Sequence, residues 1–152
     1  MDVKIIQKYA TRSQPDLIKL ATKWFNKYIR LRDCDDYGAA NCISCSKLIK
    51  YGTNYHAGHY VAAGYCSGLQ FNPLNVNAQC AQCNTHKHGN GLEYRQGLIR
   101  KIGEAKVLEI EQLKDSFKRV GYKHDKFKLI EVIEGYKGKA QKEVNNKMFE
   151  VK

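Results

Sequence analysis

Closely paired cysteines are the clearest chemical feature of this sequence. Four of the six cysteines form two pairs with two residues inside each pair, namely Cys42 with Cys45 and Cys80 with Cys83. This spacing lets both thiolates of a pair face one ion, and two pairs complete the tetrahedral four-sulfur shell that zinc prefers. Because no position stays open for water, we expect a structural zinc and not a catalytic one. Thiol redox chemistry is the competing explanation, and we expect Cys34 and Cys66 to be ordinary thiols.

Histidines and asparagines accompany the cysteine pairs in a definite order. Between the pairs lie His56-Ala-Gly-His59-Tyr60 and then Asn75, and after the second pair come Asn84, His86 and His88. This order resembles the HNH, or ββα-metal, nuclease superfamily, in which a histidine ends one strand, an asparagine opens a second, and metal ligands follow on a helix. The resemblance predicts an α+β fold, with a small zinc-stabilised ββα-metal core between flanking N-terminal and C-terminal helices.

The resemblance also implies roles for individual residues. His59 takes the position of the general base, which removes a proton from a water attacking phosphorus and must be neutral near pH 7. Asn75 takes the position of the asparagine that braces the loop orienting this histidine. Asn84 and His88 are four residues apart, so on a helix both would face a common divalent ion, expected to be Mg²⁺ or Mn²⁺. Such an ion would stabilise the charge that develops on the phosphate and its leaving 3′ oxygen.

The ligands of this second metal leave alternatives open. Many HNH enzymes add a ligand from the residue immediately before the base, but that residue is Gly58 here. His56 could substitute only if its strand bulges, because His56 and His59 point to opposite faces of a regular strand. His86 is a further candidate. For each of these histidines a structural role is the competing explanation.

The chain is strongly basic. Its 152 residues include 26 lysines and arginines against 15 aspartates and glutamates, which gives a formal net charge of +11. This charge favours a polyanionic partner such as DNA, because binding to a phosphate backbone releases condensed counterions. The expected phosphate contacts are Lys87, Arg95, Arg100 and Lys101. For these residues, and for the lysines of 126–142, an ordinary solvated face is an equal alternative.

Periodicity and capping signals predict one domain, residues 1–152, in three parts. After a capping signal at Ser13, apolar residues recur at helical spacing over 14–32, the N-terminal helix. Residues 33–102, with a β-prone stretch at 51–61, are expected to form the zinc-stapled nuclease core. A C-terminal helical arm over 104–142 completes the chain. Individual helices are predicted at 92–102, 104–120 and 125–142.

The sequence carries no membrane or export signal that we can identify. No apolar run reaches the roughly 18 residues of a membrane span, and Asp2, Lys4 and Lys8 interrupt the N-terminus. We therefore expect a cytoplasmic protein without a membrane partner. In a reducing compartment disulfides are rare, which favours metal binding by the paired cysteines.

Further motifs extend the pattern into the first helix and the helix after the cysteines. They are Phe25-Asn26, Tyr28 through Asp33, Cys42 through Cys45, Ala57 through Tyr60, Asn75 through Cys80, Cys83-Asn84, His86-Lys87, Gly89-Asn90 and Tyr94-Arg95. Together they resemble the NinG (Rap) recombination endonuclease family of lambda-like bacteriophages over about residues 20–140. This resemblance implies a phage-encoded or prophage-encoded protein of the bacterial host cell that cuts branched DNA such as Holliday junctions.

Two symmetric cuts at a junction would require a homodimer, for which the long N-terminal and C-terminal helices are candidate surfaces. Other functions stay open at this point. The first is a non-catalytic zinc DNA-binding protein, which explains the charge but not the ordered His59, Asn75 and Asn84. The second is an HNH endonuclease without junction specificity. A zinc domain for protein interaction explains neither feature.

Overall fold

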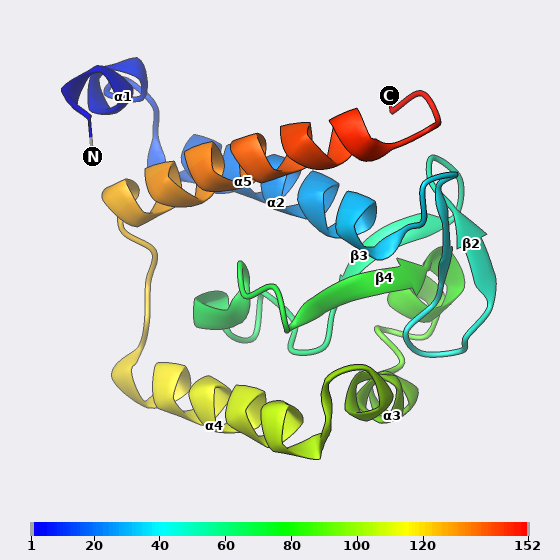
Figure 1. The fold of residues 1–152 in the computed structure, drawn as a ribbon. Helices are drawn as coiled ribbons and strands as arrows, with labels where there is room; N and C mark the ends of the chain where they lie inside the picture. Colours follow the sequence, from blue (N-terminus) through cyan, green and yellow to red (C-terminus); the bar gives the residue numbers. More distant parts are fainter. Residues whose placement is uncertain (1, 152) are drawn as a thin grey trace.

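The computed structural model describes residues 2–151, which form helices around a small β-sheet centre (Figure 1). The helices are α1 (Val3–Lys8), α2 (Gln14–Asp33), α3 (Gly91–Ile102), α4 (Glu104–Val120) and α5 (Lys126–Asn146). The strands are β1 (Ala39–Asn41), β2 (Leu48–Lys50), β3 (Tyr55–His59) and β4 (Val76–Cys80), with short helical turns η1 (Ser67–Leu69) and η2 (Gln82–His86). This mixed architecture confirms the predicted α+β class.

Side-chain caps begin both long outer helices. Ser13 Oγ accepts the backbone N–H of Asp16 at 3.3 Å at the start of α2. Asp125 Oδ1 accepts the backbone N–H of Lys128 at 2.8 Å at the start of α5. Each cap satisfies a donor that has no partner within its helix. The helix predicted at 14–32 is thus confirmed, and the one predicted from residue 125 continues to Asn146.

The helices α2 and α5 pack along each other and run in the same general direction (Figure 1). Their shared core is aliphatic and almost fully buried, and it contains Leu17, Ala21, Leu129, Ile130 and Ile133. Although α4 precedes α5 in sequence, α4 packs instead against α3 and η1. The predicted C-terminal arm therefore divides between two layers. Because α2 and α5 use their apolar faces for each other, these faces are not free for a dimer.

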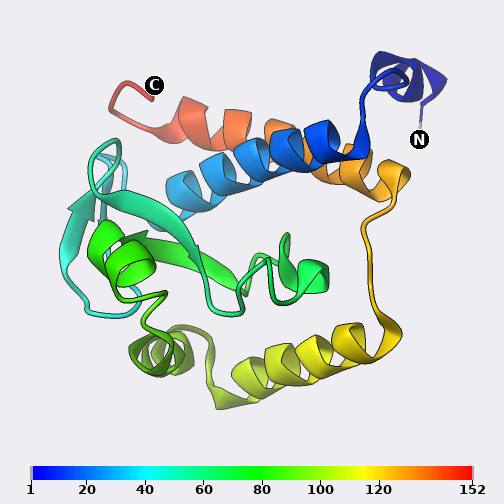
Figure 2. The same cartoon turned by 180° about the vertical axis from the view of Figure 1, so that it is seen from behind.

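Two antiparallel hairpins make the centre. Strand β1 pairs with β2, and β3 pairs with β4 so that His59 lies opposite Val76 and Tyr55 opposite Cys80. The β3–β4 sheet lies between the α2–α5 pair and the α3–α4 pair, as both Figure 1 and the reverse view in Figure 2 show. The expected β-prone stretch at 51–61 thus contains a strand at its middle.

A glycine allows α3 to approach the first cysteine pair. A Cβ at Gly97 would lie 1.7 Å from the carbonyl oxygen of Ile43, the residue after Cys42. Only glycine fits this contact without moving the helix. On its other side, α3 contributes Tyr94 and Leu98 to a core shared with α4. Helix α3 therefore packs against the first cysteine pair on one side and against α4 on the other.

Some features were not predicted or were predicted wrongly. The short helix α1 was not predicted, nor was the return of Phe149 to pack on Tyr51 near the cysteines. Leu108 and Leu113 have the spacing of helical core residues, which predicts burial, but both are more than 40% exposed, because α4 has packing partners on one side only. None of the helices within residues 2–151 is long and apolar enough to cross a bilayer.

Candidate functional site

The four paired cysteines converge at one point beside the β3–β4 sheet. Their Sγ atoms all lie within 4.8 Å of one another, and the Sγ atoms of Cys45 and Cys80 are 3.9 Å apart. Four sulfurs at about 2.3 Å from one zinc ion in a tetrahedron would lie about 3.8 Å from each other. The cluster could therefore hold a metal such as zinc.

Hydrogen-bond donors surround these thiols. The backbone N–H of Cys80 donates to Cys42 Sγ at 3.3 Å, and that of Cys83 donates to Cys80 Sγ at 3.4 Å. The side-chain amide of Asn90 donates to Cys83 Sγ at 3.5 Å. Such donors favour the thiolate form that a metal needs. A metal held here would join the β1–β2 turn to the end of β4 and to η2.

His59 ends β3 and is anchored by one ring nitrogen. Its Nε2 lies 2.9 Å from the carbonyl oxygen of Gln70. Because a carbonyl only accepts hydrogen bonds, Nε2 carries the proton and Nδ1 of the neutral ring is left as an acceptor. Burial lowers the pKa of His59 below its usual value, although the Gln70 carbonyl opposes this shift. The imidazole is therefore predominantly neutral at pH 7.

Asn75 fixes the loop that leads from His59 to Gln70. Its side chain is fully buried, with Nδ2 donating to the carbonyl oxygens of Val61 at 3.0 Å and Leu69 at 3.1 Å. Its Oδ1 accepts the N–H of Val61 at 2.8 Å. One amide thus ties both ends of the loop together. Because Leu69 directly precedes Gln70, the position of the Gln70 carbonyl that binds His59 depends on these Asn75 hydrogen bonds.

His59 and Asn84 line one pocket of about 230 Å³ together with His88. The remaining walls come from the aromatic Tyr60 and from four small residues, Ala62, Ala63, Gly89 and Gly91. Nδ2 of Asn84 donates to Nδ1 of His56 at 3.0 Å. With its nitrogen engaged in this way, Asn84 keeps Oδ1 as the atom that can bind a ligand. The structure thus brings three of the predicted site residues to one cavity.

The helical argument for Asn84 and His88 was wrong. The turn that carries Asn84 is a short π-helix ending at His86, and His88 has a left-handed backbone with φ of 50°. His88 reaches the pocket from the turn beyond the helix because the chain reverses there. His86 is exposed and lies outside the pocket walls. His56 also lies outside them, on a strand that pairs in unbroken register without a bulge.

Gly58, which lacks the expected metal ligand, has a steric reason to be glycine. A Cβ at this position would lie 2.1 Å from Oε1 of Gln79. Gln79 is fully buried, and its Nε2 donates to Ser44 Oγ at 2.9 Å and to the Gly89 carbonyl at 2.7 Å. This amide links the first cysteine pair to the wall of the His59 pocket. Sequence reasoning missed Gln79, because nothing local marks a glutamine as buried.

The four predicted phosphate contacts fall into two groups. Lys87 and Arg100 are exposed and form no ion pair with other residues of the described range. Arg95 instead pairs with Glu111, its Nε lying 2.8 Å from Oε1. Lys101 donates to Asn77 Oδ1 at 2.7 Å and lies 3.0 Å from Asp33 Oδ1. Only the first two are therefore fully available to a ligand.

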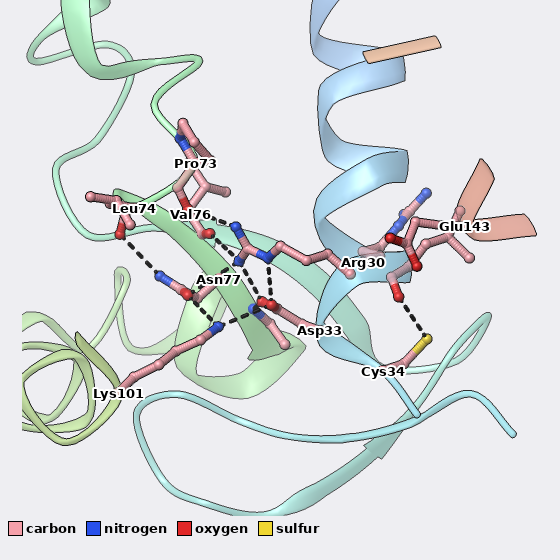
Figure 3. A network of polar contacts seen from close by, with 12 residues as sticks. Arg30, Asp33, Cys34, Pro73, Leu74, Val76, Asn77, Lys101 and Glu143 are labelled. Atoms are coloured by element: carbon pink, nitrogen blue, oxygen red, sulfur yellow. Dashed lines mark hydrogen bonds and ion pairs between the residues drawn. The ribbon is translucent and has the colours of Figure 1, made fainter. Parts of the chain in front are cut away.

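A buried polar network around Asp33 joins α2, β4 and α3 (Figure 3). The Asp33 carboxylate pairs with Arg32 at 2.7 Å and with Lys101, and it accepts the N–H of Ala78 at 2.8 Å. Burial alone would raise the pKa of Asp33, but Arg32 and Lys101 more than offset this and hold it below its usual value. Sequence reasoning missed this network because Asp33 is 68 positions from Lys101 and 45 positions from Ala78.

These features define a small α+β protein with a four-cysteine candidate metal centre beside a histidine-lined pocket. The chain belongs to the NinG family, since the family described as Bacteriophage Lambda NinG protein matches its residues 2–147. This finding confirms the family predicted from the motifs.

Similar proteins have the same designation. "Protein ninG" of Escherichia phage lambda and of Salmonella phage P22 are each 41% identical to the chain over 106 residues. "Protein ninG" of Escherichia phage 933W is 40% identical over the same length. The matched segment is 70% of this chain but only 49–50% of these relatives, so the chain spans about half of their length. No solved structure matches the chain.

Proposed function

We propose that the protein is a metal-dependent DNA endonuclease of the HNH type. The observation that carries this proposal is the pocket that joins His59 and Asn84, behind which Asn75 clasps the loop leading to Gln70. The resemblance in residue order and the basic charge point the same way. A zinc DNA-binding protein without catalysis would need none of this arrangement.

His59 would act as the general base through Nδ1. The Gln70 carbonyl occupies Nε2 at 2.9 Å, which fixes the tautomer and leaves the Nδ1 lone pair to accept a proton from water. Because burial lowers the pKa of His59, only a small fraction of its side chains is protonated at pH 7. Attack of this water on phosphorus would leave a 5′ phosphate and a 3′ hydroxyl.

Asn84 Oδ1 and His88 would hold a divalent cation, Mg²⁺ or Mn²⁺, against the phosphate. When bound, the cation supplies charge stabilisation at a non-bridging oxygen and at the leaving oxygen. The pocket fits a weakly held ion, because Mg²⁺ keeps several waters and takes few protein ligands. His56 would orient Asn84 by accepting its Nδ2 at 3.0 Å and would not bind the metal directly. His86, exposed outside the pocket, would have no role in the shell.

The four cysteines would hold zinc as a structural ion. Four thiolates fill its tetrahedral shell, so no water can be activated there. Cys80 ends the strand that follows Asn75 and Cys83 lies next to Asn84. The zinc would therefore fix the positions of Asn75 and Asn84 without taking part in cleavage.

Branched recombination intermediates such as Holliday junctions would be the substrate, as the NinG (Rap) resemblance implies. Symmetric cleavage of a junction requires two active sites, so a homodimer is part of the proposal. Lys87 and Arg100, both exposed, would contact phosphates, Lys87 beside the pocket residue His88 and Arg100 in the last turn of α3. Arg95 and Lys101 would do so only by exchanging their carboxylate partners Glu111 and Asp33 for phosphate.

Cleavage of a labelled four-way junction and of a linear duplex, with Mg²⁺ or Mn²⁺, tests the proposal. Wild type should cut the junction, and His59→Ala should bind it normally but cut it at least about 100-fold more slowly. His86→Ala is the matched control, because this exposed histidine lies outside the pocket. If wild type binds but cuts nothing with either metal, the nuclease proposal is wrong. Equal cutting of junction and duplex would refute junction specificity alone.

A further inference from the structure

Trp24 on α2 lies beneath three lysine side chains. The Nζ atoms of Lys23, Lys27 and Lys137 lie 5.7, 6.0 and 5.8 Å from the Trp24 ring. Two of these lysines come from α2 and the third from α5, so the fold assembles the group from segments more than 100 residues apart. Trp24 and Lys27 are half-buried, with Trp24 packed against the α2–α5 core, while Lys23 and Lys137 are exposed. We refer to these four residues as the Trp24 patch.

The aromatic and basic character continues along α2. Tyr28 is four residues beyond Trp24 and shares its helix face. Lys139 Nζ lies 5.8 Å from the Tyr28 ring and 4.7 Å from the ring of Tyr136. Lysine and aromatic side chains therefore recur over a further turn of the α2–α5 pair, and the sequence alone did not separate these lysines from a solvated face.

No carboxylate within residues 2–151 forms an ion pair with a lysine of the Trp24 patch. Within residues 2–151, other helical lysines such as Lys106 and Lys128 pair with glutamates one turn away, whereas no lysine of the patch forms an ion pair. Glu134, one turn before Lys137, is engaged by Lys8 at 2.7 Å. Three like charges held close to one ring repel each other, and a polyanion would relieve that repulsion.

We propose that the Trp24 patch binds an unpaired strand of DNA, with a base stacked on Trp24 and flanking phosphates on the three lysines. The part of an aromatic ring that reaches solvent can stack on any base, and the lysines around the half-buried Trp24 match the backbone that runs past a stacked base. The ligand class rests on the proposed function, in which branched DNA is the substrate. The patch lies on α2 and α5, whereas the His59 pocket is formed by β3, η2 and the loops beside them.

Because the patch and the pocket lie on different elements, they would contact different strands of the DNA. A branched intermediate presents a cleavable strand and nearby strands that leave the duplex. The patch would hold one departing strand on the α2–α5 pair while the pocket engages the strand to be cut. Specificity for a branch would then come from two contacts of moderate affinity in one protomer.

Trp24 is the only tryptophan in the sequence, so intrinsic fluorescence reports directly on the patch. The probe is a 20-nucleotide oligothymidine added to the His59→Ala protein, which cannot cut it. We expect saturable quenching of Trp24, and about tenfold weaker binding for Lys23→Gln with Lys137→Gln. Because each lysine releases counterions on binding, the salt slope of this double variant should also fall by about 1.4. Weaker binding with an unchanged slope would contradict the phosphate contacts.

The matched control is Lys106→Gln with Lys128→Gln, which removes the same charge from exposed helix positions and should bind within twofold of the parent. Equal weakening by both double variants would mean that the affinity depends only on the total charge of the protein, and it would overturn the proposal. Quenching by vesicles rich in anionic lipid but not by oligothymidine would overturn it as well. Trp24→Leu, followed by fluorescence anisotropy of a labelled oligonucleotide, should lose about tenfold in affinity with an unchanged helical circular dichroism spectrum; full affinity would exclude stacking.

The two proposals fail in different ways. Junction cleavage by wild type, together with normal oligothymidine binding by the lysine double variant, would refute the patch alone. Specific quenching of Trp24 by a protein that cuts no DNA would refute the nuclease and leave the patch standing.

Discussion

The α2–α5 helix pair and the cysteine centre are held together by different forces. Between the helices lie aliphatic side chains such as Leu17, Ile130 and Ile133, each at most 1% exposed. The interior of the centre is instead rich in cysteines and buried amides, among them Asn75 and Gln79. Apolar burial scales with area and tolerates small shifts, whereas buried amides are stable only with all partners in position. The α2–α5 pair can therefore serve as a scaffold that tolerates small shifts. The cysteine centre, in contrast, is stable only when its buried amides keep their hydrogen-bond partners.

Loss of a metal held by the four cysteines should give the largest effect and should separate the two regions. We expect Cys80→Ser, or chelation of the wild type, to disorder β3, β4 and η2, because their few aliphatic side chains cannot replace the free energy of metal binding. The proposed DNA cleavage should then fall to background, while α2 and α5 keep most of their amide protection in hydrogen exchange. Cys66→Ser is the control, since Cys66 is buried but outside the cluster. Uniform loss of protection over both regions would contradict their independence.

Asp33 connects the two regions, and its removal should come next in size. We expect Asp33→Asn to lower the free energy of unfolding by about 4 kcal/mol at pH 7, because Arg32 and Lys101 lose a buried partner. The folded pKa of Asp33 lies below its unfolded value of about 3.9. Its contribution is thus complete above about pH 5 and is lost as pH falls through 3.9 toward the folded pKa.

Urea unfolding of wild type and Asp33→Asn at several pH values measures this difference. Because both proteins carry the same cysteines, acid release of a metal cancels when the two are subtracted. Below the folded pKa the two stabilities should converge. A difference that stays constant below pH 4 would show that Asp33 acts through shape and not through its charge.

The sequence predicted the outer helices and the cysteine cluster better than the contacts that connect them. Caps and periodicity sufficed for α2 and α5, because both signals are local. The spacing of the cysteine pairs correctly predicted a single four-thiol cluster for the same reason. In contrast, the anchor of His59 is the backbone carbonyl of Gln70, which any residue could provide, and no sequence pattern marks it. The Asp33 network and the Gln79 contact with Gly58 join distant segments, which periodicity cannot detect.

A cavity in the helix pair should have a smaller and more local effect. We expect Ile133→Ala to destabilise the protein by about 3 kcal/mol, through lost burial and an unfilled space. Since Ile133 belongs to the α2–α5 core and not to the centre, metal content and the rate of cleavage at low temperature should stay unchanged. Thermal unfolding and metal analysis of the same sample test this. Metal loss on this substitution would mean that the scaffold and the centre fold as one unit.

Asn75 offers the smallest expected change in stability and the most informative one. Asn75→Ala leaves two carbonyls and one N–H of the loop without their partner, which costs about 2 kcal/mol once water reaches part of them. The variant should still bind metal, because the cysteines are unaffected. Its cleavage rate should nevertheless fall by more than tenfold, since the loop no longer holds the Gln70 carbonyl against His59 Nε2. Asn72→Ala, which removes one hydrogen bond to Leu74 in the same segment, is the control and should cut normally. Equal rates for the two variants would mean that Asn75 only stabilises the centre, and that His59 keeps its orientation without the clasp.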